Sequence, residues 1–311
     1  MSSLKEIKSR IASVKNTLKI TSAMKMVASA KLHKAQSAIG NNLPYEQKLH
    51  KMLSGLLQGE GLMNALQKEL GLGNGGKSPV TLQDMASDAI SLKEDVSRVA
   101  VVVFSSNSSL IGAFNANVIK KFNQTMNLLS ENGYSRTDID IYTVGKKIAE
   151  SVRRDGYGIH MDLPDLSDKP DFAKASALAA ELVDRFVSGE IGQVILIYNH
   201  FASMSSQPSV RENYLPIALQ DYNETSQPVD YILEPDPLEL VQDLLPLVLN
   251  LKIYTVALDA SAAEHAARTV AMQVASDNAK DLISELTLAY NKGRQQEITA
   301  EILDLVGGMQ D

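Results

Sequence analysis

Apolar side chains recur at alternating steps of three and four residues near both ends of the chain, with polar side chains between them. Near the start these positions are Leu4, Ile7, Ile11, Val14 and Leu18, and near the end they are Met272, Ala275, Ala279, Leu282 and Leu286. Such spacing places one apolar seam along a helix and is typical of coiled coils. The pattern therefore predicts two terminal helices that pack against each other.

The first of these helices is expected to occupy residues 1–58. Its first 39 residues contain neither glycine nor proline, and the helical pattern continues past Pro44 and Tyr45. After Thr21 the apolar positions move to Met24, Ala28, Leu32, Ala35 and Ile39. This shift predicts a change of phase that would locally alter the supercoil.

The second helix is expected to occupy residues 237–311. Asp236 can cap the free amides of the first turn, Pro237 suits the first helical position, and Glu239 can complete a capping box. Pro246 could kink the helix. If it is continuous, the helix is roughly 105 Å long, several times the usual length in globular proteins.

Between the terminal helices, residues 98–219 alternate between short β-branched runs and helical patterns, which predicts an α/β domain with a largely parallel, Rossmann-like sheet. The expected strands are 99–104, 138–144 and 193–198, with a further edge strand in 207–219, and the expected helices are 114–131, 146–155 and 172–187. Residues 220–236 would connect this domain to the last helix. The expected fold class is therefore α/β plus coiled coil.

The glycine-rich segment 59–97 reads as an insertion or hinge. Within it, Gly71 to Ser78 satisfies the phosphate-loop pattern G-x-x-x-x-G-K-S. A phosphate loop should follow a buried strand, whereas Leu62 to Leu70 is rich in helix formers. A chance match in a linker is the better interpretation, and a nucleotide-binding enzyme that uses this loop stays open as an alternative.

Candidate chemistry elsewhere is sparse. The polar run Ser105 to Ser109 follows the first expected strand, where α/β sheets often bind ligands, but it lacks the three-glycine dinucleotide pattern and reads as a turn. The five histidines show no metal-ligand spacing, and Asp162 to Asp171 reads as a proline-containing loop. No catalytic set, metal site or cofactor site is expected.

Composition and charge narrow the function classes. The chain has 311 residues, no cysteine and a net charge of −7, so thiol chemistry is excluded. Residues 1–58 carry ten Lys/Arg against two acidic residues, giving +8, whereas residues 259–311 carry four against nine, giving −5. The basic segment lacks interleaved aromatic residues, so nucleic-acid binding is not expected. A solvated helix face and a surface for an acidic protein partner both stay open.

No apolar run approaches the roughly 20 residues that a membrane-spanning helix requires, so the chain is expected to insert no transmembrane segment.

The two terminal stretches together resemble the gamma subunit of F-type ATP synthases. The resemblance rests on Ile20 to Leu32 near one end, and on Glu264 to Arg268, Leu286 to Lys292 and Arg294-Gln295 near the other. It implies an antiparallel coiled coil inside a ring of three alpha and three beta subunits, with the central α/β domain beside the lower shaft. It also implies contacts with the epsilon subunit and the membrane c-ring, and a role as a non-catalytic rotor.

The resemblance also implies sites. Met24 and Lys25 would meet the beta subunits, and the tip residues Ile298, Ile302, Leu305 and Val306 would turn in the catalytic ring. Pro44, Tyr45 and Tyr231 would lie near the foot. The chain would be peripheral, on the cytoplasmic face of a bacterial inner membrane. A free-standing coiled-coil scaffold is the other alternative.

Overall fold

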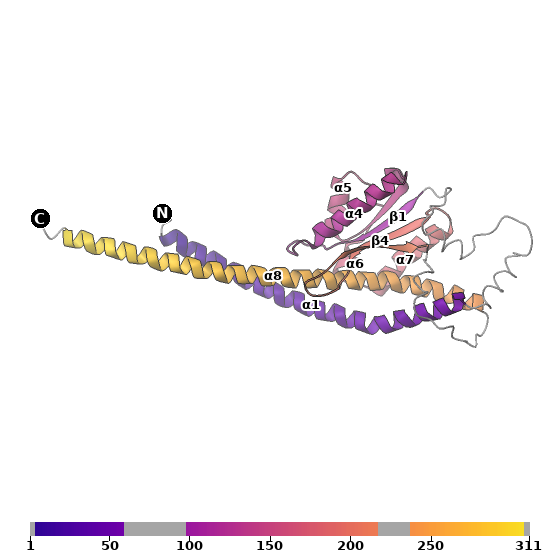
Figure 1. The fold of residues 1–311 in the computed structure, drawn as a ribbon, viewed down its shortest axis with the longest axis horizontal. Coiled ribbons are helices and arrows are strands. Elements are labelled where there is room, and N and C mark those ends of the chain that lie inside the picture. Colours follow the sequence, from indigo (N-terminus) through magenta and orange to yellow (C-terminus); the bar gives the residue numbers. More distant parts are fainter. Residues whose placement is uncertain (1–3, 59–97, 217–236, 308–311) are drawn as a thin grey trace, which may run out of the picture.

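A computed structural model describes residues 4–58, 98–216 and 237–307 (Figure 1). The terminal helices α1 (Leu4–Gln58) and α8 (Pro237–Gly307) run antiparallel as a long two-helix shaft, and an α/β domain lies against α8. The expected combination of a coiled coil and a central α/β domain is therefore confirmed. The phosphate-loop pattern at 71–78 and the connecting segment 220–236 fall outside the described residues.

The α/β domain contains one five-stranded sheet in the order β3-β2-β1-β4-β5. β1, β2, β3 and β4 pair in parallel, and β5 pairs antiparallel with β4 at one edge. The strands are β1 (Val99–Phe104), β2 (Ile139–Val144), β3 (Met161–Asp162), β4 (Gln193–Asn199) and β5 (Ser209–Leu215). The helices of this domain are α4 (Phe114–Glu131), α5 (Lys146–Arg154), α6 (Pro164–Asp168) and α7 (Phe172–Val187).

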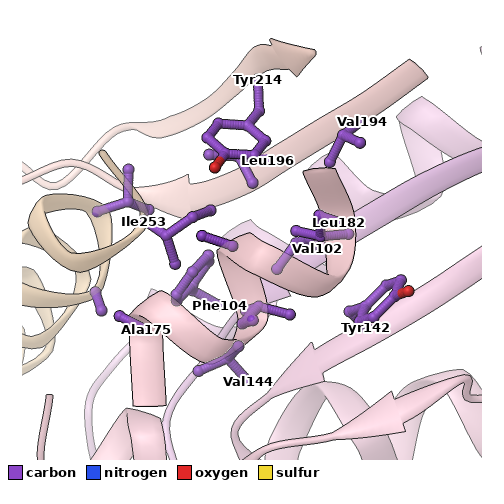
Figure 2. Packing of buried hydrophobic residues seen from close by; sticks show 14 of the residues in the cluster. Val102, Phe104, Tyr142, Val144, Ala175, Leu182, Val194, Leu196, Tyr214 and Ile253 are labelled. Carbon is purple, nitrogen blue, oxygen red and sulfur yellow. The ribbon is translucent and has the colours of Figure 1, made fainter. Parts of the chain in front are cut away.

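Helices cover both faces of the sheet, which explains why every residue of the central strand β1 is buried. On one face, Val118 and Phe122 of α4 and Ile148 of α5 pack on the sheet. On the other face, Leu182 of α7 and Ile253 of α8 join the strands in a single core (Figure 2). The shaft helix α8 is thus part of the domain core.

The register of the two shaft helices follows from two contacts far apart. A side chain added at Gly293 would lie 2.9 Å from Leu4 Cδ2, and Thr21 Oγ1 lies 2.8 Å from Ser276 Oγ. The 17 positions from Leu4 to Thr21 match the 17 from Gly293 back to Ser276. The helices therefore keep one antiparallel register along this length.

The predicted change of phase after Thr21 is wrong. Less exposed positions continue in steps of three and four through Leu18, Thr21, Lys25, Ala28, Leu32 and Ala35. Polar side chains simply occupy two seam positions, where Thr21 contacts Ser276 and the Lys25 ammonium donates to Gln273 Oε1. A count of apolar residues alone skips these two positions and so suggests a shift.

The structure decides one question that the sequence left open and changes one expectation. Pro246 lies within a continuous α8, because Val248, Leu249 and Leu251 beside it are buried and hold the helix in place. The acidic stretch expected to be a loop contains β3 and α6. Its last member, Asp171, caps α7 by accepting from the amides of residues 173 and 174 at 3.0 and 3.3 Å.

Gly40 gives a test of the shaft. It lies exposed within α1, and an added methyl group would meet nothing within 4 Å. Because glycine costs about 1 kcal/mol relative to alanine inside a helix, Gly40→Ala should raise the free energy of unfolding by about 0.5–1 kcal/mol. Urea unfolding of the full chain measures this. Gly293→Ala should gain less, because its methyl group would displace Leu4, and equal gains would contradict the packing at the end of the seam.

Candidate functional site

At the carboxyl ends of β1 and β2, where Rossmann-like folds bind ligands, the chain itself bonds to the free helix amides. The first amides of α5 are all bonded: Asn107 Oδ1 accepts from residue 146 at 2.9 Å, the Ser106 carbonyl from residue 147 at 3.1 Å, and Ser105 Oγ from residue 148 at 3.0 Å. These are the donors that would otherwise hold an anion. The run Ser105 to Ser109, interpreted as a polar turn, therefore caps a helix.

Gly145 makes this close packing possible. Its φ is +111°, and a Cβ at this position would lie 2.2 Å from the Ser105 carbonyl oxygen. No side chain fits at that distance, so the loop after β2 can approach the loop after β1 only with glycine here. The two loops are locked together at the place where a cofactor would enter.

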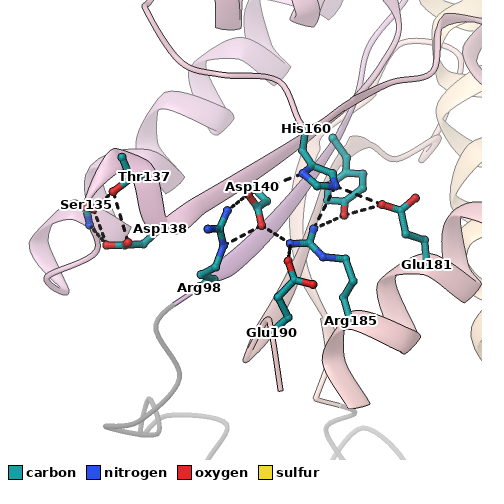
Figure 3. Close-up of polar contacts among 10 residues, drawn as sticks. Arg98, Ser135, Thr137, Asp138, Asp140, His160, Glu181, Arg185 and Glu190 are labelled. Carbon is teal, nitrogen blue, oxygen red and sulfur yellow. Dashed lines mark hydrogen bonds and ion pairs between the residues drawn. The ribbon is translucent and has the colours of Figure 1, made fainter. Parts of the chain in front are cut away.

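The opposite end of the sheet carries a network of charges (Figure 3). Asp140 on β2 accepts from Arg98 Nε at 3.2 Å and from Arg185 Nη2 at 2.7 Å, and Arg185 Nη1 also donates to the Tyr142 hydroxyl at 2.6 Å. Burial tends to raise the pKa of Asp140, but the hydrogen bonds from both arginines outweigh it and hold this pKa below its usual value. Arg185 in turn pairs with Glu190. Every charge has a partner, which is typical of a structural network.

A second polar group joins the domain to the shaft. On α8, Arg268 contacts Glu264 at 2.8 Å and donates to Ser108 Oγ of the β1–α4 loop at 2.6 Å. Burial raises the pKa of Glu264 in spite of Arg268, and burial together with Arg268 and Lys31 lowers the pKa of His265 to about 4.

Earlier in α8, five residues before Glu264, Asp259 accepts from the Phe201 amide at 2.9 Å and lies 2.6 Å from His200 Nδ1. Both residues belong to the segment between β4 and β5. The α/β domain is therefore tied to the shaft helix at two levels.

The free end of α8 has a different character. Its last 14 residues, 294–307, extend beyond the start of α1 at Leu4 (Figure 1). Every side chain described there is exposed. Ile298, Ile302 and Leu303 are 46–65% exposed. Leu305 and Val306 lie in the same helix, but their side chains are outside the description. A helix with apolar side chains left in solvent is typical of a surface that a partner covers.

Apolar side chains are also exposed on both sides of the shaft at the level of the Thr21–Ser276 contact, which we call the neck. Ile20, Met26 and Val27 on α1 and Val274 on α8 are 53–66% exposed. The sequence indicated Met24 and Lys25 instead, and both are only half-exposed. The Lys25 ammonium donates to Gln273 Oε1 of α8. The missed residues could have been found as apolar side chains that lie off the seam. We call these four residues the neck surface.

The other expected residues are distributed as follows. All ten seam residues are partly or fully buried while the positions around the N-terminal seam are mostly exposed. At the foot, Pro44 and Tyr45 are exposed within α1, and Tyr231 lies outside the described residues. Within the described ranges no group of acidic, histidine or cysteine side chains could hold a metal ion. No helix in that part of the chain could cross a membrane.

Fold and surfaces together define a shaft protein: two antiparallel helices carry a rigid α/β domain at one end and a bare apolar tip at the other. Comparison with known proteins agrees with this class. The ATP synthase family matches residues 3–310. The ATP synthase gamma chains of Bacteroides thetaiotaomicron and Bacteroides fragilis are each 51% identical, with 99% of both chains covered. The chain therefore belongs to the gamma chain family of ATP synthases.

Solved structures agree in fold. A chain of the Euglena gracilis mitochondrial ATP synthase matches with a TM-score of 0.59 at 18% identity, covering 99% of this chain and 93% of that one. A chain of the Tetrahymena thermophila mitochondrial central stalk and c-ring matches with a TM-score of 0.52 at 22% identity, covering 83% and 99%. At this identity the likeness concerns the fold alone.

The Asp140 network gives a test of stability. Asp140 is 7% and Arg185 11% exposed, so Asp140→Asn removes the charge that compensates two guanidinium groups. The free energy of unfolding at pH 7 should fall by about 3 kcal/mol. Asp165→Asn is the matched control, because Asp165 is 82% exposed beside Lys174 and should change stability by less than about 1 kcal/mol.

The same variant has a defined pH dependence. Because the folded pKa of Asp140 lies below the unfolded value of about 3.9, its contribution is complete above that pH. It is lost as the pH falls through the lowered pKa. The stability difference between the wild type and Asp140→Asn should therefore shrink as the pH falls below about 4. Urea titrations across this range measure it, and a difference that grows with acid would contradict the network.

Proposed function

We propose that this chain is the central rotor of an F-type ATP synthase, with its bare tip inside the ring of alpha and beta subunits. The observation that carries the proposal is the last stretch of α8, which extends beyond α1 with apolar side chains in solvent. Its membership of the gamma chain family supports the same role. An apolar tip suits a turning shaft, because nonpolar contacts lack the directional bonds that would hold one orientation.

The neck surface is proposed to meet the beta subunits, together with Met24 and Lys25. It combines exposed apolar side chains with the basic face of α1, on which Lys19 and Lys31 are exposed. A partner that offers apolar and acidic side chains would complement both features. As the shaft turns, the beta subunits would meet different faces of it in succession, and this difference in contact would shift their nucleotide-binding states.

The opposite end of the molecule is proposed to stand on the membrane ring. There the exposed Pro44 and Tyr45 mark the foot, with the epsilon subunit and the c-ring as partners. The chain would be peripheral, on the cytoplasmic face of a bacterial inner membrane. In this role it performs no chemistry and binds no cofactor: ion flow turns the ring, and ATP is made or hydrolysed on other subunits.

A charge at the tip tests the proposal. Ile302→Asp with Leu303→Asp would place two carboxylates inside an apolar sleeve, where burying an unpaired charge is costly. ATP-driven ion pumping by the assembled complex in membrane vesicles should fall about tenfold, equivalent to about 1.4 kcal/mol. Pumping and ATP hydrolysis are measured together, so that uncoupling is distinguished from loss of catalysis.

Leu128→Asp is the matched control. Leu128 is an apolar residue of α4 with 45% exposure, and it lies in the α/β domain, away from the tip. The same chemical change there should leave pumping unaltered. Normal pumping by the tip variant, in a complex that still contains the chain, would overturn the placement of the tip in the ring.

A further inference from the structure

A polar pair interrupts the apolar seam of the shaft. Thr21 and Ser276 are 8% and 4% exposed, and their hydroxyl oxygens lie 2.8 Å apart. Thr21 Oγ1 also donates to the Leu18 carbonyl at 3.1 Å. Since a hydroxyl has one proton, Thr21 accepts from Ser276. The bond therefore joins the two helices in a defined direction, at a position where the heptad pattern favours an apolar side chain.

A chain of bonds next to this pair strengthens the same level. The Lys25 ammonium donates to Gln273 Oε1, and Gln273 Nε2 donates to Asp277 at 2.6 Å. Lys280 holds the other oxygen of Asp277 at 3.0 Å. These bonds connect α1 to three successive turns of α8, so the polar level extends beyond a single contact.

The part of the seam next to this level specifies register weakly. Towards the domain, the buried partners of Leu32 and Ala35 are the small side chains Ala262 and Ala266. Small uniform side chains interlock little, so a helix displaced by one heptad would meet nearly the same surface. Among the described elements, α1 makes extensive contacts with α8 alone, aside from Phe201 of the domain near Leu32. The position of α1 is therefore set along the shaft, by the packing of Leu4 on Gly293 and of Leu49 on Val248 and Leu251, and by the polar level between these contacts.

We propose that Thr21 and Ser276, with the adjacent Lys25 and Gln273, fix the axial register of α1 on α8 and act as positioning residues of the rotor. In the native register Thr21 faces Ser276. A slip of one heptad would place Thr21 opposite Ile283 or Thr269, and Ser276 opposite Ala28 or Val14. Either slip separates Thr21 from Ser276 and places the buried Ser276 hydroxyl opposite an apolar side chain, and the polar level therefore disfavours both.

The functional consequence rests on the proposed function. A slip of one heptad moves α1 about 10 Å along α8. Ile20, Met26 and Val27 on α1 would then be out of line with Val274 on α8, so the neck surface that faces the ring would be divided. Register is a property of this chain alone and can be measured separately from its contacts with the ring.

Engineered cysteines can report the register, because the natural chain has none. Leu286→Cys is combined with Ile11→Cys for the native register, since these residues lie seven positions inside Gly293 and Leu4. Leu286→Cys with Leu4→Cys or Leu18→Cys reports a slip of one heptad in either direction. In the purified full chain, oxidation or a short thiol crosslinker should join the native pair and leave the two slipped pairs largely unjoined.

Thr21→Val with Ser276→Val is then introduced into all three pairs. Valine fills the space without a hydroxyl, so the shaft should stay folded while the yield of the slipped pairs rises about fivefold, the ratio that one ordinary hydrogen bond contributes. Thr21→Ser with Ser276→Thr keeps both hydroxyls and should restore the native pattern. The matched control is Thr17→Val with Thr287→Val, which removes two exposed, backbone-bonded hydroxyls away from the seam.

Unchanged slipped yields in the double valine variant would overturn the proposal. If that variant fails to fold, Thr21→Ala with Ser276→Ala, which fits both sites, is interpreted in the same way. The crosslinking pattern does not depend on the ring, whereas the Ile302 and Leu303 experiment does. A failure of the proposed function would therefore alter the pumping result and leave the register result in place.

Discussion

The whole structure depends on α8 being shared between the shaft and the α/β domain. From Leu251 to Thr269 nearly every side chain of α8 is buried or half-buried, which is unusual for a helix in a two-helix coil. Ile253 and Val256 pack into the sheet core, while Ala262 and Ala266 receive α1. A helix that belongs to two cores cannot turn in one without moving the other. The domain and the shaft must therefore rotate as one body.

Polar contacts also join α8 to two loops of the α/β domain. Arg268 reaches the β1–α4 loop, and Asp259 holds the backbone of Phe201, so the domain cannot pivot about α8. At the neck and the tip, by contrast, apolar side chains such as Met26 and Leu303 are left in solvent, and the described chain provides nothing to cover them. Rigidity inside the chain and exposed apolar side chains outside it both suit a rotating shaft.

The sequence predicted the elements closely, because strong periodicity reports packing directly. Val99–Phe104 and Phe172–Val187 were expected with the bounds that the structure has. The phase of the seam was misjudged because polar residues occupy positions that pattern reasoning assigns to apolar ones. Thr21 and Lys25 lie in the seam, and their partners Ser276 and Gln273 are some 250 positions away, so no local window pairs them. The neck surface was missed for the converse reason, since its apolar residues lie off the seam.

The α/β domain illustrates why the fold alone does not specify function. A parallel sheet with helices on both faces offers helix amides at the carboxyl ends of its strands, and in many proteins a phosphate accepts from them. Here Ser105 and Asn107 accept from those amides, and Gly145 lets the two loops close on each other. The amides that usually bind a ligand are therefore bonded to a neighbouring loop of the same domain. The neighbouring Ser108 accepts from Arg268 of the shaft, so the same loop that closes the ligand position also helps to hold the domain on α8.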